Sequence, residues 1–231
     1  MSLLPQVKTQ PEDSHWLSLS DLMAGLMMVF LLISVLMMRS VMLEREKIKT
    51  IAVSYHETQL AIYQALIDEF EYDLNRFGVN IDQQSLTVVF TRDDAMFETG
   101  KDIISDDYKM ILAEFFPRYL SVILHFKDSI EEVRLEGHTN SQWAGSLNEN
   151  DAYFKNLELS QDRTRSVLSF LYSLEQTMVQ QNWIKSHLAA VGYSSSKAII
   201  NDNVEDRLQS KRVVFRIISD SQLKIRSILE Q

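Results

Sequence analysis

The apolar run near the N-terminus begins with an ionisable side chain. Asp21 stands near the start of SDLMAGLMMVFLLISVLMM, which extends from Ser20 to Met38. Its carboxyl group could stabilise the first turn of a helix, whose N-terminus favours negative charge. Alternatively it could exchange a proton, because a low-dielectric environment favours the neutral acid. Ser18 and Ser20 lie within one helical turn of Asp21 and could bind its carboxyl group or a water molecule, although helix capping is the preferred role for Ser20.

The apolar run itself has the length of a membrane-spanning helix. No charged residue occurs from Leu22 to Met38, and apolar neighbours extend the run to the roughly 20 residues that a helix needs to cross about 30 Å of hydrocarbon. A cleaved signal peptide would have basic residues before the run and small residues after it, whereas here Glu12 and Asp13 precede it and Arg39 follows it. A buried core helix would carry a polar face. We therefore predict an uncleaved membrane anchor.

Composition excludes several classes of function. The formal net charge of -9 opposes binding to the phosphate backbone of nucleic acids. The absence of cysteine excludes disulfides, thiolate metal sites and a thiol nucleophile. The five histidines are scattered without the spacing of metal ligands. We expect no nucleic-acid partner, no cofactor or metal and, since no catalytic constellation is visible, no enzymatic activity.

The chain after the anchor predicts a helix followed by an α/β domain. Apolar residues recur about every 3.5 to 3.6 positions from Glu44 to Phe77, with Gly78 ending the helix, and either a dimeric coiled coil or packing on the domain explains this spacing. Strand and helix patterns then alternate, which predicts an α/β sandwich. The expected strands are SLTVVF, IEEVRLEGH, LAAVGY and RVVFRI, and the expected helices are DDYKMILAEFFPRYLSVIL, with Pro117 as a break or kink, and a segment through Leu159, Val167, Leu171 and Leu174.

Successive segments of this domain resemble the motifs of OmpA-like peptidoglycan-binding domains, in the same order. EGHTN (136–140), NLELSQDR (156–163), VGYSS and RLQSKRVVFRI (207–217) are similar to that family's G-H-T-D, N-x-x-L-S-x-x-R, G-x-G and N-R-R-V motifs. MFETGKDII also resembles the F-x-x-G segment that follows the family's first strand. The resemblance covers about residues 85 to 218 and implies a domain that binds the cell wall.

The resemblance also implies which residues bind peptidoglycan: Asn140, Asn156, Arg163 and Arg212. Arg163 matches the arginine that, in the family, binds the carboxylate of the diaminopimelate side chain. Asn140 replaces the aspartate that helps to bind the amino end of the same side chain. A carboxamide still accepts a hydrogen bond from ammonium but lacks charge assistance, so we expect weaker wall binding or a different stem peptide. Arg212 is the remaining match in the fourth motif, because Ser210 and Lys211 replace its first two residues.

An OmpA-like domain behind a span that begins W-x-x-x-x-D-L-M resembles MotB-like subunits of ion-driven stators. The segment HWLSLSDLMAGLMMVFLLI is more similar still to the B subunit of the Zorya anti-phage defence system, in which a MotB-like protein partners a MotA-like membrane protein. The resemblance implies a homodimer of this chain inside a ring of MotA-like subunits, expected as a pentamer. It also favours proton translocation by Asp21, with Trp16, Ser18 and Ser20 beside the ion path. A flagellar-type MotB and a passive peptidoglycan tether remain as alternatives.

The orientation of the span rests on the resemblance. Lys8 is the one basic residue before the span, whereas Arg39, Arg45, Lys47 and Lys49 follow it, and this charge count alone would place the C-terminal side in the cytoplasm. The family instead places the span in the bacterial inner membrane, with the N-terminus in the cytoplasm. The domain then lies in the periplasm, where its peptidoglycan ligand is found. We expect a cytoplasmic tail (1–15), a transmembrane helix (16–43), a periplasmic connecting or dimerisation helix (44–80), the OmpA-like domain (81–219) and a C-terminal tail (220–231).

Overall fold

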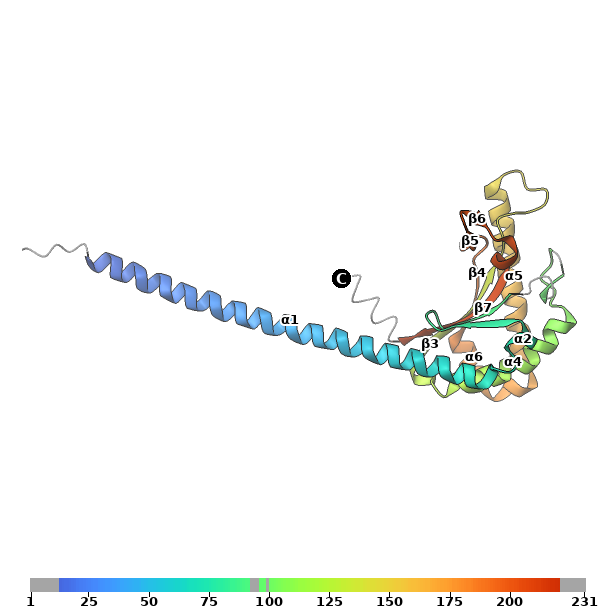
Figure 1. Cartoon of the computed structure of the whole chain (residues 1–231), viewed down its shortest axis with the longest axis horizontal. Helices are drawn as coiled ribbons and strands as arrows, with labels where there is room; N and C mark the ends of the chain where they lie inside the picture. Colours follow the sequence, from blue (N-terminus) through green and yellow to red (C-terminus); the bar gives the residue numbers. More distant parts are fainter. Residues whose placement is uncertain (1–12, 92–95, 99, 221–231) are drawn as a thin grey trace, which may run out of the picture. The chain divides into compact units, whose positions relative to one another are not determined.

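The computed structural model describes residues 13–91, 96–98 and 100–220, and of residues 13–15, 17 and 18 it describes the backbone alone. In this part of the chain a long helix is followed by a domain of strands and shorter helices (Figure 1). The chain divides into two compact units, residues 1–50 and 51–231. Nearly all of the predicted N-terminal and C-terminal tails lies outside the described residues.

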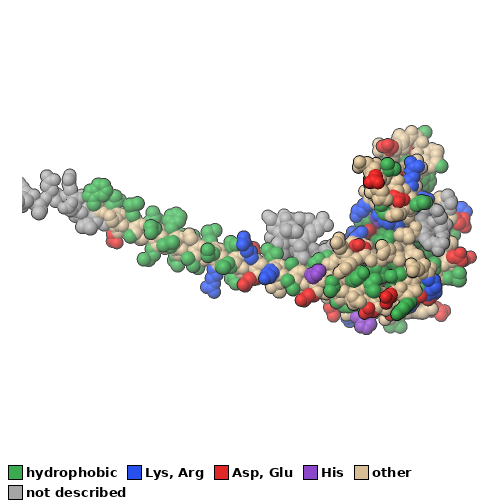
Figure 2. Space-filling view, in the orientation of Figure 1, with side chains coloured by type: hydrophobic (Ala, Val, Ile, Leu, Met, Phe, Trp, Pro, Cys, Tyr) green, Lys and Arg blue, Asp and Glu red, His purple; other side chains and the backbone are tan. Residues whose placement is uncertain are grey.

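Helix α1 (Asp13–Phe70) contains the predicted membrane anchor. By length and composition, the part of α1 from Leu19 onward could cross a membrane. It contains an 18-residue segment with a mean hydropathy of 2.3, and none of that segment is buried. Figure 2 shows hydrophobic side chains along this N-terminal part of α1. A contiguous apolar surface of this kind is unfavourable in water and marks contact with a membrane or a partner.

A five-stranded sheet with the order β1-β2-β7-β3-β4 forms the centre of the second unit. Strands β3 and β4 are parallel, whereas the other neighbouring pairs are antiparallel. The strands are β1 (Val79–Asp82), β2 (Thr87–Phe90), β3 (Ile130–His138), β4 (Leu188–Gly192) and β7 (Arg212–Ser219), and a small hairpin is made by β5 (Ile200–Asn201) and β6 (Val204–Glu205). A parallel pair requires a crossover connection, which is usually helical; here α5 (Glu149–Ser173) and α6 (Gln181–His187) supply it.

Helices α4 and α5 pack on the same face of the sheet. Aromatic side chains of α4 contact this face, with Phe115 5.1 Å from Phe90 and 5.8 Å from Phe215 between ring centroids. Pro117 lies inside α4, and the helix continues to Leu124. Of the predicted break or kink, the break is therefore wrong, and the kink stays a prediction. The buried residues on both sides of Pro117 keep the helix on the sheet despite one lost hydrogen bond. The helical segments are α4 (Asp106–Leu124), η1 (Lys127–Ser129), α5 (Glu149–Ser173), η2 (Glu175–Gln180), α6 (Gln181–His187) and α7 (Arg207–Ser210). This architecture confirms the predicted α/β fold class behind an N-terminal helix.

The C-terminal part of α1 belongs to the core of the second unit. Ile62, Leu66 and Phe70 are fully buried in the same cluster as the sheet residues. Phe70 lies 4.8 Å from the ring of Phe115. The helix predicted from Glu44 to Phe77 is interrupted, because α1 ends at Phe70 and a turn (71–73) leads into α2 (Leu74–Phe77). The C-cap of α2, Gly78, has the left-handed conformation with φ 64°, as predicted for the residue that ends the helix. Of the two explanations for the apolar spacing in this region, packing on the domain therefore holds for residues 62–70.

Candidate functional site

A hollow of about 350 Å³ brings together three of the four residues expected to bind peptidoglycan. Asn140, Asn156 and Arg163 all line it. Asn140 follows the end of β3, and the other two lie on α5. The remaining described residues around the hollow are Phe97, Gly100, Thr139, Gln142, Trp143, Ala144, Leu159 and Lys211.

Two glycines allow α5 to approach the sheet closely enough to form this hollow. A Cβ atom on Gly137 of β3 would lie 2.6 Å from the backbone oxygen of Ser160. A Cβ atom on Gly192 of β4 would lie 2.5 Å from the backbone nitrogen of Gln161. Both distances are far shorter than van der Waals contact, so only glycine fits without moving the helix. The glycines of the EGHTN and VGYSS segments thus position the NLELSQDR segment beside the end of β3.

The loop after β3 is held from both sides. The buried side chain of Asn156 donates from Nδ2 to the carbonyl oxygens of Asn140 and Gln142, both at 3.1 Å. The Glu205 carboxylate, from the β5–β6 hairpin, accepts hydrogen bonds from the backbone N and Oγ of Ser141 at 2.9 and 2.5 Å. The Oδ1 atom of Asn140 accepts from the backbone N of Gln142 at 3.2 Å. Because these bonds fix the loop, its groups are ordered before any ligand arrives.

Arg163 is anchored along its length. Its side chain is buried, its Nε donates to the carbonyl oxygen of Lys101 at 3.0 Å, and the guanidinium carbon lies 4.6 Å from the centre of the Phe97 ring. A guanidinium held in one plane presents its donors in the fork geometry that suits a carboxylate. The structure therefore places a fixed cation at the edge of the hollow.

Thr139 is a site residue that the motif comparison did not single out. Its side chain is buried and lines the hollow, yet its Oγ1 has no hydrogen-bond partner among the described residues. A buried hydroxyl without a partner costs free energy, and a ligand group in the hollow would satisfy it. Trp143 was also missed, because it lies in the polar loop between the motifs and has no counterpart in them.

The structure does not bring Arg212 into the same hollow. Its guanidinium donates to the carbonyl oxygens of Ser210 and Lys197, both at 3.0 Å. Burial lowers the pKa of Arg212 below its ordinary value. Its assignment to peptidoglycan binding stays a prediction.

A buried ion pair lies on the sheet face opposite α4 and α5. Arg216 donates from Nε to Oε1 of Glu136 at 2.7 Å, and the Nε2 atom of His138 lies 3.2 Å from Oε2 of the same carboxylate. Burial acts to raise the pKa of Glu136, but hydrogen bonds from His138 and Arg216 prevail and lower it to about 2. Burial lowers the pKa of His138 below its ordinary value, although the hydrogen bond with Glu136 acts in the opposite direction. The ring also stacks on Tyr193 at 5.2 Å.

The residues of the predicted ion path all lie on α1. The helix begins at Asp13, which places Asp21 eight residues inside it (21 − 13) rather than in its first turn. Ser20 is not a helix cap, because it lies in the body of α1 and its Oγ donates to the carbonyl oxygen of Trp16 at 2.8 Å. The backbone of Ser18 is helical, and its side chain lies outside the described part of the structure.

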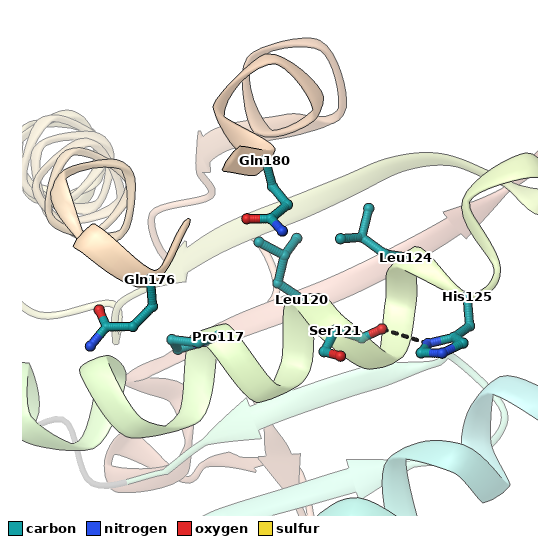
Figure 3. A pocket seen from close by; sticks show the side chains of 7 residues that line it. All are labelled: Pro117, Leu120, Ser121, Leu124, His125, Gln176 and Gln180. Carbon is teal, nitrogen blue, oxygen red and sulfur yellow. Dashed lines mark hydrogen bonds between the residues drawn. The ribbon is translucent and has the colours of Figure 1, made fainter. Parts of the chain in front are cut away.

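Another hollow, of about 270 Å³, lies between the C-terminal half of α4 and η2 (Figure 3). The described residues around it are apolar or neutral apart from His125, whose Nδ1 lies 2.7 Å from the carbonyl oxygen of Ser121. It contains no residue of the predicted site and no fixed charge. Among the described residues, no group of three or more His, Asp or Glu side chains is arranged to hold a metal ion.

Comparison with known proteins identifies the relatives of this chain. No family model matches the sequence. The chain is 45% identical over 225 residues to the Zorya protein ZorB of Escherichia coli, an alignment that covers 97% of this chain and 96% of that protein.

Solved structures with a similar fold include two MotB-type proteins. A MotB-like protein from Desulfovibrio vulgaris aligns with a TM-score of 0.49 at 17% identity, over 70% of this chain and 91% of that chain. The periplasmic domain of Helicobacter pylori MotB aligns with a TM-score of 0.41 at 21% identity, over 62% and 83%. The similarity to Zorya B subunits predicted from the span is confirmed over almost the whole sequence. The chain belongs to the family of the Zorya protein ZorB.

Proposed function

We propose that this chain is the B subunit of a proton-driven stator complex in Zorya anti-phage defence. In this proposal two copies of the chain lie inside a ring of MotA-like subunits, and the α/β domain holds the complex to peptidoglycan in the periplasm. The observation that carries the wall-binding part is the hollow that gathers Asn140, Asn156 and Arg163, three residues matched to the wall-binding motifs. The role is that of an anchor and ion carrier rather than of an enzyme.

Recognition of the stem peptide follows from the chemistry around the hollow. The fixed guanidinium of Arg163 suits a two-pronged, charge-assisted contact with a carboxylate. The carboxamide of Asn140 offers a weaker, uncharged contact to an amino group, and the buried hydroxyl of Thr139 adds a third polar group. A zwitterionic side chain such as that of diaminopimelate has both charged ends that this arrangement needs.

The position of Asp21 supports its role in proton transfer. The helix dipole acts within the first turn, so it does not explain a carboxylate eight residues inside α1 (21 − 13). A charge near hydrocarbon is costly, and acidic residues in spans mark ion paths or partner contacts. Moving one elementary charge across the membrane supplies about 2.3 kcal/mol per 100 mV, which is the energy that a stator converts into rotation.

Wall binding is tested by co-sedimentation of the detergent-solubilised chain with purified sacculi. Arg163→Ala should weaken binding by roughly 10- to 100-fold, since hydrogen bonds to charged groups contribute about 1.5–3 kcal/mol. Asn140→Ala, which removes an uncharged contact, should weaken it by less than about 10-fold. Arg165→Ala is the matched control, because Arg165 lies on the same helix, is exposed and pairs with Asp162. Equal retention of all four proteins would remove the wall-binding assignment.

Proton transfer is tested by phage-plating efficiency in cells that carry the complete defence system. Asp21→Asn keeps the size of the side chain but cannot exchange a proton, so it should abolish protection while leaving expression and assembly with the partner intact. Glu44→Gln, a charge-removing change further along α1, should keep protection. A passive tether predicts full protection with Asp21→Asn, and that result would return Asp21 to a structural role.

A further inference from the structure

The hollow between α4 and η2 lies close to the point where the chain leaves the sheet after β7. Ser219, the last residue of β7, pairs with Ile130, the first residue of β3. Ile130 follows His125, which lines the hollow, by five positions. The chain between them contains the 3₁₀ helix η1, in which each residue advances about 2 Å. With about 5 Å between paired strands, the end of β7 lies roughly 10–15 Å from the hollow.

The sequence after Asp220 carries an apolar face and has the length to reach this hollow. It reads SQLKIRSILEQ over residues 221–231, and a helix of that length spans about 16 Å. Ile225, Ile228 and Leu229 have the i, i+3, i+4 spacing that places apolar side chains on one face of a helix. The backbone is already helical at Asp220. A helix this short is marginal in water by itself, so its apolar face needs a surface within reach.

The hollow offers an apolar surface and an unsatisfied acceptor. Pro117, Leu120 and Leu124 of α4 line it. From η2, Gln180 points toward Leu120 (Figure 3), and its buried Oε1 has no hydrogen-bond partner among the described residues. A buried acceptor without a donor costs free energy. Lys224, which flanks the apolar face of the predicted helix, carries donors for such an acceptor.

The short helix η2 also exposes apolar side chains beside the hollow. Met178 is 58% exposed and Val179 is 91% exposed, and both lie between the lining residues Gln176 and Gln180 in the sequence. From the exit point of the chain, its reach and the match of apolar faces, we infer that residues 221–231 of the same chain occupy the hollow between α4 and η2. This contact ties the last strand of the sheet to the helical layer, and it is independent of wall binding and proton transfer.

Cysteine labelling tests this inference, because the chain has no cysteine of its own. Ser121→Cys places one thiol at an exposed position in the hollow. In the full chain in detergent micelles, a bulky maleimide should label this thiol at least about 10-fold more slowly than in a chain that also carries Ile225→Ser and Ile228→Ser, since labelling requires the segment to leave the hollow. Leu223→Ser, on the other side of the predicted helix, is the matched control and should keep the slow rate. Ser196→Cys, an exposed serine after β4 and outside the hollow, should be labelled equally fast in all of these backgrounds.

Disulfide formation shows which copy of the segment occupies the hollow. With Ser121→Cys and Leu229→Cys in one chain, mild oxidation should join the two thiols within that chain at least about 10-fold faster than it joins Ser196→Cys and Leu229→Cys, because docking raises their effective concentration. Equal labelling rates with and without the two isoleucines, or equal rates for the two disulfide pairs, would refute the inference. A disulfide between co-expressed chains that carry one cysteine each, with none inside the double variant, would assign the hollow to the segment of a second copy and overturn the assignment to the same chain.

Discussion

The C-terminal part of α1 should decide whether the α/β domain folds by itself. Ile62, Leu66 and Phe70 are 0% exposed and Phe77 is 3% exposed, and all of them belong to the core of the domain. A fragment beginning at residue 81, the boundary predicted from the motifs, lacks these four side chains and the first half of β1. A fragment beginning at Ile51, where the second compact unit starts, keeps them. We expect residues 51–231 to fold cooperatively and residues 81–231 to be molten or insoluble.

The burial of these side chains sets the size of the effect. Full burial of a large apolar side chain contributes about 1.5–3 kcal/mol, so the four together contribute roughly 6–12 kcal/mol. The whole free energy of unfolding of a domain is about 5–15 kcal/mol. The shorter fragment also removes Glu69 and Asp73, whose carboxylates lie 2.5 and 2.8 Å from the guanidinium of Arg118 on α4. The loss therefore equals most or all of the stability of the domain.

Urea unfolding followed by circular dichroism measures this difference. Residues 51–231 should show one sigmoidal transition, whereas residues 81–231 should show a gradual change and should bind a hydrophobic dye. Within the longer fragment, Leu66→Ala should lower the free energy of unfolding by about 2–5 kcal/mol. Leu60→Ala, on the same helix but 46% exposed, should change it by less than about 1 kcal/mol. Equal transition midpoints for the two fragments would refute the reasoning and would support the boundary at residue 81.

Two further predictions concern the sheet, and both are measured by urea unfolding of residues 51–231. The pKa of Glu136 is lowered from 4.5 to about 2, so as the pH falls the unfolded state binds this proton before the folded state does. The free energy of unfolding should therefore fall by about 3 kcal/mol as the pH drops from about 4.5 to about 2. Glu136→Gln should flatten this pH dependence, and an unchanged slope would show that other carboxylates cause it. Gly192→Ala places a Cβ atom 2.5 Å from the backbone nitrogen of Gln161 and should lower stability by about 1–3 kcal/mol or more, whereas a stable variant would mean that α5 can move away.

The elements predicted correctly from the sequence are those whose signal is local. Strand β3 covers Ile130–His138 as expected, because alternation over nine residues records which face of the strand is buried. Gly78 ends a helix as expected, since a left-handed residue is a local requirement that glycine meets. The order of the segments that resemble OmpA-like motifs also led to three residues that line one hollow.

The features that the sequence did not reveal depend on contacts between distant segments. Strand β1 is four residues long, with alternating buried and exposed positions, and pairing with β2 rather than its own pattern makes it a strand. The apolar positions of α1 suit a coiled coil and a domain core equally well. The contact between Phe70 of α1 and Phe115 of α4 shows that this part of α1 packs in the core, and the sequence does not show this contact. The Oγ1 of Thr139, which has no partner among the described residues, and the position of Trp143 at the hollow depend on the packing of α5 against β3. A sequence motif does not record such packing.

The asparagine at position 140 follows from the residues around the loop. The family aspartate would place a carboxylate next to Ser141, whose backbone N and Oγ are already bound by the carboxylate of Glu205. Two carboxylates close together disfavour each other's charged form. Asn140 keeps an oxygen that accepts from the backbone N of Gln142 without adding a second negative charge. Glu205 of the β5–β6 hairpin thus places a negative charge one residue from position 140 in the sequence, at Ser141, and its two hydrogen bonds fix the loop after β3.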